Sequence, residues 1–407
     1  MIKKNKLYEL LSLIVVIYLF LFCINFFFQK KHNEYISERI SKIENLDIDR
    51  RHQYLVLKEM NLIEPTVQAQ HPVIYLYRAD DYKKDFFPLS GYSSSKTLMC
   101  NENGYWKSTR TDKYGFNNTE ENYQKAAIND NNILIIGDSS SEGYCVKDNY
   151  LPKYHLENLG YNVINLSKGG NGPIIEYASL KEYIEIANFK TVIWMYYPND
   201  LNDLLIESQD SVLMKYLNSN FHQNIINKQN LVDNFYRDKS DGFNQYVNFI
   251  NEADISKLDK KFEELEKLDY FTKKLNLSTF NIIDYFFLKS LILDIKSRVK
   301  FLKMKNDIKV TYPILKQTLL KAKTTIDKNN AKMLFVYLPS RIDILSQSKI
   351  DTNVVNILND LEIDYLDLNE KIVGNFKYEE AYSYGLDDVH YNEKVYEVIS
   401  KEISKLF

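Results

Sequence analysis

A short apolar segment that ends in Gly-Asp-Ser constrains the fold of this chain more than any other feature. Residues 133–136 read Ile-Leu-Ile-Ile, a run that predicts a buried strand. Residues 137–139, Gly-Asp-Ser, favour a sharp turn directly after it. The turn presents Ser139 at the carboxyl end of the strand, where ligands bind in α/β sheets. Ser139 is therefore a candidate nucleophile, although most Gly-Asp-Ser tripeptides are ordinary turns.

A candidate base and carboxylate lie near the other end of the sequence. Asp387 and His390 are three residues apart and precede an amphipathic segment from Lys394 to Leu406. In a loop that enters a helix, this spacing lets Asp387 hold Nδ1 of His390, so that Nε2 faces outward as a general base. The alternative is a histidine at a helix entry with an aspartate as the cap. Asp388 competes for the carboxylate role, but its spacing favours a cap or a solvated position.

Two further strand ends supply candidate donors for an oxyanion. Residues 161–166 predict a second strand that opens into a glycine-rich turn, and residues 191–197 predict a third strand that leads to Asn199. The N–H of Gly169 or Gly170 can approach an oxyanion closely because no Cβ intervenes, and the Asn199 amide can donate as well. Each segment alone is consistent with a plain turn, but their places at successive strand ends favour a shared site.

Together these residues resemble the SGNH hydrolases, also called GDSL-type esterases or lipases. Ser139 and Gly143 match the first block of that family, Gly170 the second, Asn199 the third, and residues 387–390 the last. Gly169 is a second candidate for the glycine, with Gly170 preferred. Ser140 departs from the pattern, since a bulky apolar residue often follows the nucleophile, and residues 111–118 resemble the run before the first block in membrane-anchored bacterial members.

The resemblance implies a catalytic triad and an oxyanion hole. The triad is Ser139, Asp387 and His390. The oxyanion hole consists of the N–H groups of Ser139 and Gly170 and the amide of Asn199. The implied fold is a three-layer α/β/α domain of the flavodoxin-like SGNH type, and the implied activity needs no cofactor and no metal.

The implied function is that of a serine hydrolase acting on carboxylic esters through a covalent acyl-enzyme. The expected partner is an acyl-ester substrate, with an O-acyl (acetyl) esterase on an exported glycan or lipid as the leading form. An O-acyltransferase that modifies a surface polysaccharide is the alternative, because only the acceptor differs. A non-catalytic surface scaffold is the third possibility, and the intact motif residues argue against it.

Residues 7–28 predict a signal anchor. They form a nearly continuous apolar run in which Glu9, Ser12 and Asn25 are the clearly polar exceptions. At about 1.5 Å per residue, such a helix spans a hydrocarbon core of about 30 Å. No small-residue cleavage site follows, since residues 26–31 read Phe-Phe-Phe-Gln-Lys-Lys. We expect a single-pass protein with its catalytic domain on the periplasmic or extracellular side, although flanking lysines nearly balance the positive-inside rule.

Composition and cysteine content bear on two further questions, whether the protein binds nucleic acid and whether it contains a disulfide. A net charge of −3 with 26% charged residues argues against a strongly basic nucleic-acid binder, so no nucleic-acid partner is expected. Of the three cysteines, Cys23 lies in the predicted span. Cys100 and Cys145 then either form a disulfide outside the cytoplasm or remain two independent buried thiols.

Two more apolar segments, 333–338 and 363–368, complete a predicted parallel sheet of about five strands with helices on both faces. A helix-rich insertion interrupts this order and is either a lid or acceptor platform over the site, or a structural or partner-binding subdomain. The expected organisation is a signal anchor at 1–28, a stalk and irregular leader at 29–125, and a hydrolase domain at 126–407 with the insertion at about 205–325.

Overall fold

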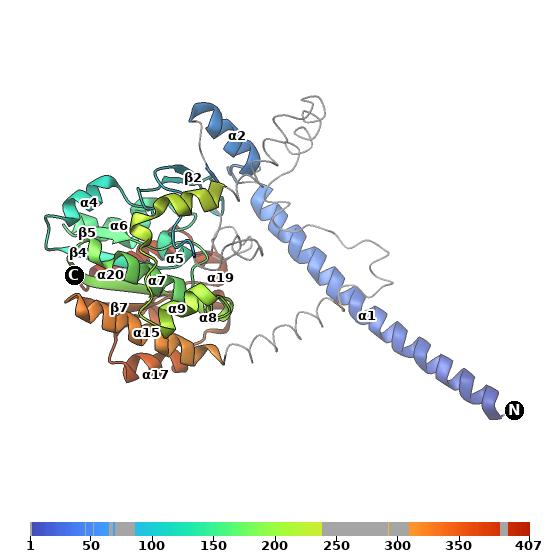
Figure 1. The fold of residues 1–407 in the computed structure, drawn as a ribbon. Coiled ribbons are helices and arrows are strands. Elements are labelled where there is room, and N and C mark those ends of the chain that lie inside the picture. Colours follow the sequence, from blue (N-terminus) through green and yellow to red (C-terminus); the bar gives the residue numbers. More distant parts are fainter. Residues whose placement is uncertain are drawn as a thin grey trace. The chain divides into compact units, whose positions relative to one another are not determined.

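The computed structural model describes residues 2–44, 46–51, 53–64, 68–69, 86–237, 292, 309–382 and 390–407. The chain divides into two compact units (Figure 1). The first comprises residues 1–47 and 271–309, and its main described element is helix α1 (Ile2–Glu44). The second comprises residues 48–270 and 310–407 and contains both sheets.

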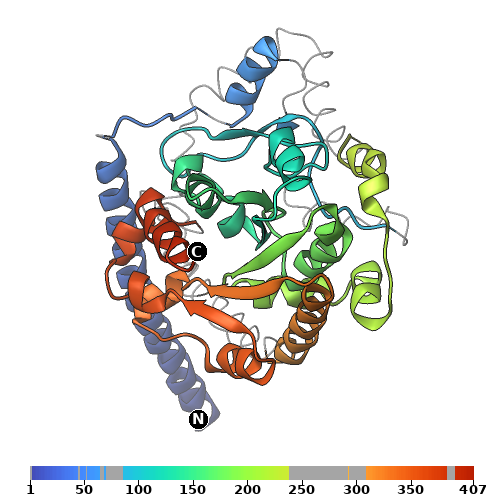
Figure 2. The ribbon, with the colours of Figure 1, turned by 90° about the vertical axis from the view of Figure 1, so that its left-hand side faces the viewer.

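A five-stranded parallel sheet forms the centre of the second unit, with the strand order β5-β4-β6-β7-β8. Figure 2 shows the orange strands β7 and β8 beside the green part of the same sheet. The order changes direction between β4 and β6, and ligands bind beyond the carboxyl ends of strands at such points. This confirms the predicted α/β class and the parallel sheet. The strands are β4 (Asn132–Gly137), β5 (Asn162–Asn165), β6 (Phe189–Tyr196), β7 (Lys332–Tyr337) and β8 (Asp364–Asp367).

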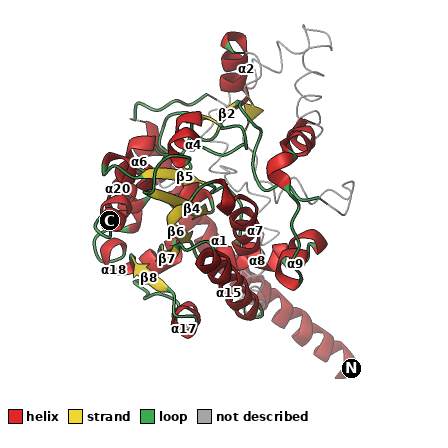
Figure 3. Cartoon of the chain, turned by 60° about the vertical axis from the view of Figure 1, so that its left-hand side comes forward, coloured by secondary structure: helices red, strands yellow, loops and turns green. Residues whose placement is uncertain are grey.

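Helices cover both faces of this sheet (Figure 3). Side chains alternate along a strand, so Ile133 and Ile135 of β4 join one core, and the buried Leu134 and Ile136 face the opposite layer. The first core also contains residues of α6 (Pro152–Asn158) and α20 (Glu393–Ser404). Helices α7 (Pro173–Tyr183) and α15 (Thr311–Lys328) pack on the other face. Because both faces are covered, the two central strands contain continuous apolar runs, Ile133–Ile136 in β4 and Val192–Tyr196 in β6.

Part of the predicted insertion lies outside the described residues, namely 238–291 and 293–308. Helix α8 (Asp200–Glu207), at the start of the range, packs against α7. Helix α15 packs against α7 and β7 and so belongs to the cover of the sheet, whereas the sequence prediction extended the insertion to about residue 325. The other α-helices of this unit with both ends described are α2 (Gln53–Ile63), α4 (Glu120–Ala126), α5 (Ser139–Glu142), α9 (Ser211–Asn218), α16 (Arg341–Ser346), α17 (Thr352–Asp360), α18 (Asn369–Ile372) and α19 (Tyr378–Ala381).

The leader before the large sheet has regular structure of its own. Strands β1 (Gln68–Ala69), β2 (Lys96–Leu98) and β3 (Ser108–Arg110) form a small sheet in which β2 and β3 pair antiparallel. Asn118 then fixes the leader to the end of β5, because it accepts from the Asn165 N–H at 2.8 Å and donates to the Asn165 carbonyl at 3.0 Å. The leader therefore belongs to the same packed unit as the large sheet.

Helix α1 contains the one segment in the described part of the chain that is long and apolar enough to cross a membrane. This segment is Leu11–Lys31, with a mean hydropathy of 2.7, and it overlaps the predicted anchor at 7–28. The helix continues without a break from this segment to Glu44.

Candidate active site

Glycine and a capping aspartate fix the position of Ser139 at the end of β4. Gly137 has a φ of +153°, and a Cβ there would lie 2.0 Å from the Ser141 hydroxyl, so the turn requires glycine. Asp138 is the N-cap of α5, and its carboxylate accepts from the Ser140 N–H at 2.7 Å. Ser139 is thus the first helical residue, and its own N–H has no partner within the helix.

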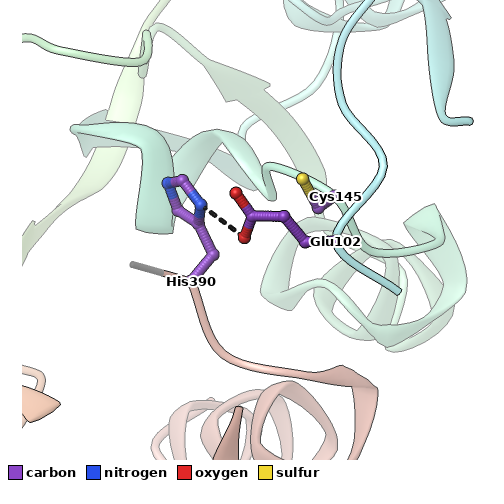
Figure 4. A group of neighbouring side chains, drawn as sticks. All are labelled: Glu102, Cys145 and His390. Atoms are coloured by element: carbon purple, nitrogen blue, oxygen red, sulfur yellow. Dashed lines mark hydrogen bonds and ion pairs between the residues drawn. The ribbon is translucent and has the colours of Figure 1, made fainter. Parts of the chain in front are cut away.

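Ser139, His390 and Glu102 form a continuous hydrogen-bonded chain. The Ser139 Oγ lies 2.8 Å from Nε2 of His390, and Nδ1 of His390 lies 2.9 Å from Oε2 of Glu102. Figure 4 shows the His390–Glu102 contact. Because a carboxylate only accepts, Nδ1 carries the proton and Nε2 is free to accept the serine proton. All three side chains are buried, which strengthens these interactions.

Sequence reasoning missed Glu102, and it assigned the carboxylate role to Asp387. Asp387 lies outside the described residues, which resume at His390. Glu102 and His390 are 288 residues apart, and Glu102 lies in the loop between β2 and β3. The available signal was indirect, since Glu102 lies two residues after Cys100 and Cys145 lies close to the nucleophile in sequence.

A disulfide and several hydrogen bonds hold the Glu102 loop against the nucleophile turn. Cys100 and Cys145 form a disulfide, so they are not two independent thiols. The Asn103 amide donates to the Cys145 carbonyl at 2.6 Å, and the Lys107 ammonium donates to the Gly143 carbonyl at 2.8 Å. The loop is therefore attached on both sides of the position that carries the carboxylate.

The glycine-rich turn after β5 lies beside the nucleophile turn. The Lys168 N–H donates to the Gly137 carbonyl at 3.3 Å. The Gly169 N–H donates to Oε2 of Glu142 at 2.7 Å and is therefore occupied. The Gly170 N–H has no acceptor among the described residues. This difference supports the preference for Gly170 over Gly169 as an oxyanion donor.

Asn199 follows β6 and precedes α8, so it lies at the end of the strand next to β4. Its Nδ2 donates to Oδ2 of Asp203 at 3.1 Å, and this carboxylate fixes which end of the amide carries the nitrogen. Burial raises the pKa of Asp138, while the Ser140 N–H, the charge of His390 and Asn199 lower it. Asn199 thus lies close to Asp138, the neighbour of the nucleophile.

Glu176 and Asp200 are buried carboxyl groups that have no cationic partner among the described residues. Burial raises the pKa of Glu176 well above its usual range, and the nearby Asp138 and Glu207 raise it further. Burial likewise raises the pKa of Asp200, with contributions from Glu176 and Asp138. Within the described residues no Lys, Arg or His forms an ion pair with Glu176 or Asp200. These groups are therefore held in their protonated form to a higher pH than exposed carboxyls.

A possible metal-binding group coincides with the same site. The ligand atoms of Glu102, Cys145 and His390 lie within 4.8 Å of one another (Figure 4). Metal binding would need the thiolate of Cys145, and this sulfur is bonded to Cys100. Both ring nitrogens of His390 are also engaged by Ser139 and Glu102. The donor set present therefore fits a hydrogen-bonded triad better than a metal centre.

No protein-family model matches this chain, and no curated protein sequence matches it either.

Proposed function

We propose that the protein is a serine hydrolase that cleaves carboxylic esters through a covalent acyl-enzyme. The observation that carries this proposal is the hydrogen-bonded chain from Ser139 through His390 to Glu102. A serine, a histidine in the correct tautomer and a buried carboxylate are the three parts of a nucleophile, base and orienting group. The flavodoxin-like strand order and the resemblance to SGNH hydrolases agree with this function.

The proposed reaction begins when Ser139 Oγ attacks the acyl carbon and transfers its proton to Nε2 of His390. Glu102 stabilises the resulting imidazolium through Nδ1. The N–H groups of Ser139 and Gly170 and the Asn199 amide stabilise the oxyanion of the tetrahedral intermediate, each donor contributing roughly 3 kcal/mol in the transition state. His390 then protonates the departing alkoxide. Water attacks the acyl-serine with His390 again as the base, which releases the acid and restores Ser139.

The proposed compartment is the outside of the cytoplasmic membrane. The Cys100–Cys145 disulfide supports it, because disulfides persist in oxidising compartments. The apolar segment of α1 supports it as well, since it would anchor the chain at the membrane surface. An ester on an exported glycan or lipid is the substrate class consistent with this location, and we propose an O-acetyl group on such a molecule.

The test is turnover of short acyl esters and of acetylated oligosaccharides by the detergent-solubilised full-length protein. Ser139→Ala should lower kcat by several orders of magnitude and leave the melting temperature within about 2 °C of the parent value. Ser141→Ala is a suitable control, because this serine lies in the same short helix. If Ser139→Ala retains the parent rate on every ester that the parent cleaves, the mechanism is wrong.

A further inference from the structure

The loop between β5 and α7 has nearly all of its backbone donors occupied. The Lys168 N–H donates to the Gly137 carbonyl, and the Asn171 N–H donates to the Lys168 carbonyl. The backbone N–H groups of Gly169, Gly172 and Ile174 donate to glutamate carboxylates and not to backbone carbonyls. Pro173 has no N–H, so Gly170 carries the one N–H from 168 to 174 that has no acceptor in the described part of the chain.

Glu142 holds the first part of this loop. Its Oε2 accepts from the Gly169 N–H at 2.7 Å, and its Oε1 accepts from the Lys168 ammonium at 2.8 Å. The Asn117 amide donates to the same Oε1 at 3.3 Å. Glu142 and Lys168 are buried, so the pair is shielded from water. Glu142 is in the same four-residue helix as Ser139, and this contact therefore couples the loop to the nucleophile.

Glu207 holds the second part of the loop from the other side. Its Oε1 accepts from the Gly172 N–H at 2.7 Å, and its Oε2 accepts from the Ile174 N–H at 2.8 Å. Gly172 permits this approach, because a Cβ there would lie 2.8 Å from the Asp203 Cβ and 2.9 Å from Glu207 Oε1. Glu207 belongs to α8, the helix that begins directly after Asn199.

We propose that Glu142 and Glu207 are positioning residues that fix the loop so that the Gly170 N–H faces the developing oxyanion. One glutamate ties the loop to the helix of Ser139, and the other ties it to the helix that follows Asn199. The arrangement would set the relative positions of the three oxyanion donors without any glutamate touching the substrate. This inference rests on the proposed ester hydrolysis and adds to it two residues that the family motif does not include.

Glutamine substitutions test each contact with little change in shape. Gly169 and Lys168 donate to different oxygens of Glu142, so in Glu142→Gln one of these donors faces the amide nitrogen. We expect Glu142→Gln and Glu207→Gln to lower kcat by about 10- to 100-fold with KM within about twofold, because the oxyanion is absent from the bound ester and develops only on the way to the tetrahedral intermediate. We expect a smaller loss of kcat than removal of an oxyanion donor would cause, because the Gly170 N–H group remains in both variants.

Glu182→Gln is the matched control. Glu182 is also buried, and it accepts from the Gln223 N–H at 2.5 Å and the Ile225 N–H at 3.0 Å. These contacts hold a turn that is not part of the proposed machinery. Glu182→Gln should lower the melting temperature to a similar extent and leave kcat at the parent value. If Glu142→Gln and Glu207→Gln also leave kcat unchanged well below their melting temperatures, the glutamates are structural only and the proposal is wrong.

A second readout separates this proposal from the proposed function. Hydrogen–deuterium exchange of the peptide covering residues 168–172 needs no substrate. Faster exchange of this peptide in Glu142→Gln than in the parent and in Glu182→Gln would support the positioning role. Unchanged exchange would overturn it. If the parent protein cleaves no ester in a Ser139-dependent manner, the proposed function fails whichever result the exchange experiment gives.

Discussion

The local sequence motif and the described contacts point to different candidates for the orienting carboxylate. The spacing of Asp387 and His390 suggested a pair formed within one loop, but the described contact to Nδ1 comes from Glu102. A single carboxylate is sufficient to hold the histidine tautomer, and Glu102 is buried as well as hydrogen-bonded. We therefore assign the orienting role to Glu102 on the geometry, and this assignment can be measured against Asp387.

The first prediction compares two variants that replace a carboxylate with an amide of the same shape. Glu102→Gln should lower kcat by about 10³- to 10⁴-fold with little change in KM, because an amide can also donate to Nδ1 and so no longer fixes the tautomer, and it lacks the charge that stabilises the imidazolium. Asp387→Asn should lower kcat by less than about tenfold. The measurement is steady-state kinetics on one ester for both variants and the parent. A large loss in Asp387→Asn with near-parent activity in Glu102→Gln would restore the role to Asp387.

The second prediction concerns the buried carboxyl group of Glu176. Its pKa is raised well above the value of 4.5 that describes an exposed glutamate. The folded state therefore retains the proton to a higher pH than the unfolded chain, so this group increasingly reduces stability as the pH rises above about 4.5. Glu176→Gln removes this cost. We expect its melting temperature to exceed the parent value by on the order of 5 °C at pH 8 and by much less at pH 5.

Thermal unfolding of the purified parent and Glu176→Gln proteins at the two pH values measures this difference. The sign of the change in melting temperature is informative, because loss of a favourable ion pair would lower the melting temperature of Glu176→Gln. A variant that is destabilised equally at pH 5 and pH 8 would show that the carboxylate is ionised and satisfied in the folded protein.

Among the elements, the strands of the large sheet were predictable and the leader was not. Each central strand contains apolar, often β-branched residues and has Gly, Asn or Pro at its end or just beyond it, so hydrophobicity and turn residues locate it from local information. Strands β2 and β3 have three residues each and contain no run of apolar residues, so neither gives such a signal. Their position depends on packing against distant residues, including the contact of Asn118 with Asn165.

The same distinction applies to the site. Ser139, Gly170 and Asn199 each follow a predicted strand, and the parallel order of the sheet brings the ends of these strands together. Glu102 contacts His390 from the loop between β2 and β3, which the Cys100–Cys145 disulfide holds in place. Neither the cysteine pairing nor the path of this loop can be derived from residue spacing. The placement of Ser139, Gly170 and Asn199 after neighbouring strands could therefore be predicted, whereas the contact of Glu102 with His390 could not.

The third prediction concerns the disulfide between the leader and the nucleophile turn. The double variant Cys100→Ser/Cys145→Ser should lower kcat by about tenfold, because Glu102 loses the covalent link closest to it and samples other positions. The contacts of Asn103 and Lys107 should limit the loss. The variant should also unfold at a lower temperature, since a cross-link over 45 residues restricts the unfolded chain by roughly 4 kcal/mol in the loop-entropy treatment.

Cys23→Ser provides the control for this experiment, because Cys23 is a free thiol in α1. It should behave like the parent in both kinetics and thermal unfolding. A reductant added to the Cys23→Ser protein should reproduce the kinetic loss of the double variant. Parent-like kcat in the double variant would show that hydrogen bonds alone keep Glu102 in place.

At the scale of the whole molecule, the chain combines a long N-terminal helix with a second unit that contains the hydrogen-bonded Ser139, His390 and Glu102 of the proposed triad. The apolar segment of α1 is largely exposed in the structure, which is unfavourable in water and favourable in a lipid bilayer. All three triad residues come from the second unit, so the proposed chemistry needs no residue of α1. We infer that α1 determines where the reaction takes place and the second unit determines what the reaction is.

The last prediction tests this division. The full-length protein should remain in the membrane pellet after high-salt and carbonate washes, because the apolar segment of α1 would be buried in the bilayer. Its N-terminal peptide should still contain residues before Leu11, since no cleavage site follows the apolar run. Protease added to the outer side of the cytoplasmic membrane should digest the part after α1, in line with the Cys100–Cys145 disulfide.

Release of the washed protein into the soluble fraction, or a mature N-terminus after residue 28, would identify the segment as a cleaved signal peptide or a peripheral helix. Protection of the second unit from the protease would instead place the triad on the cytoplasmic side, where an exported ester could not be its substrate.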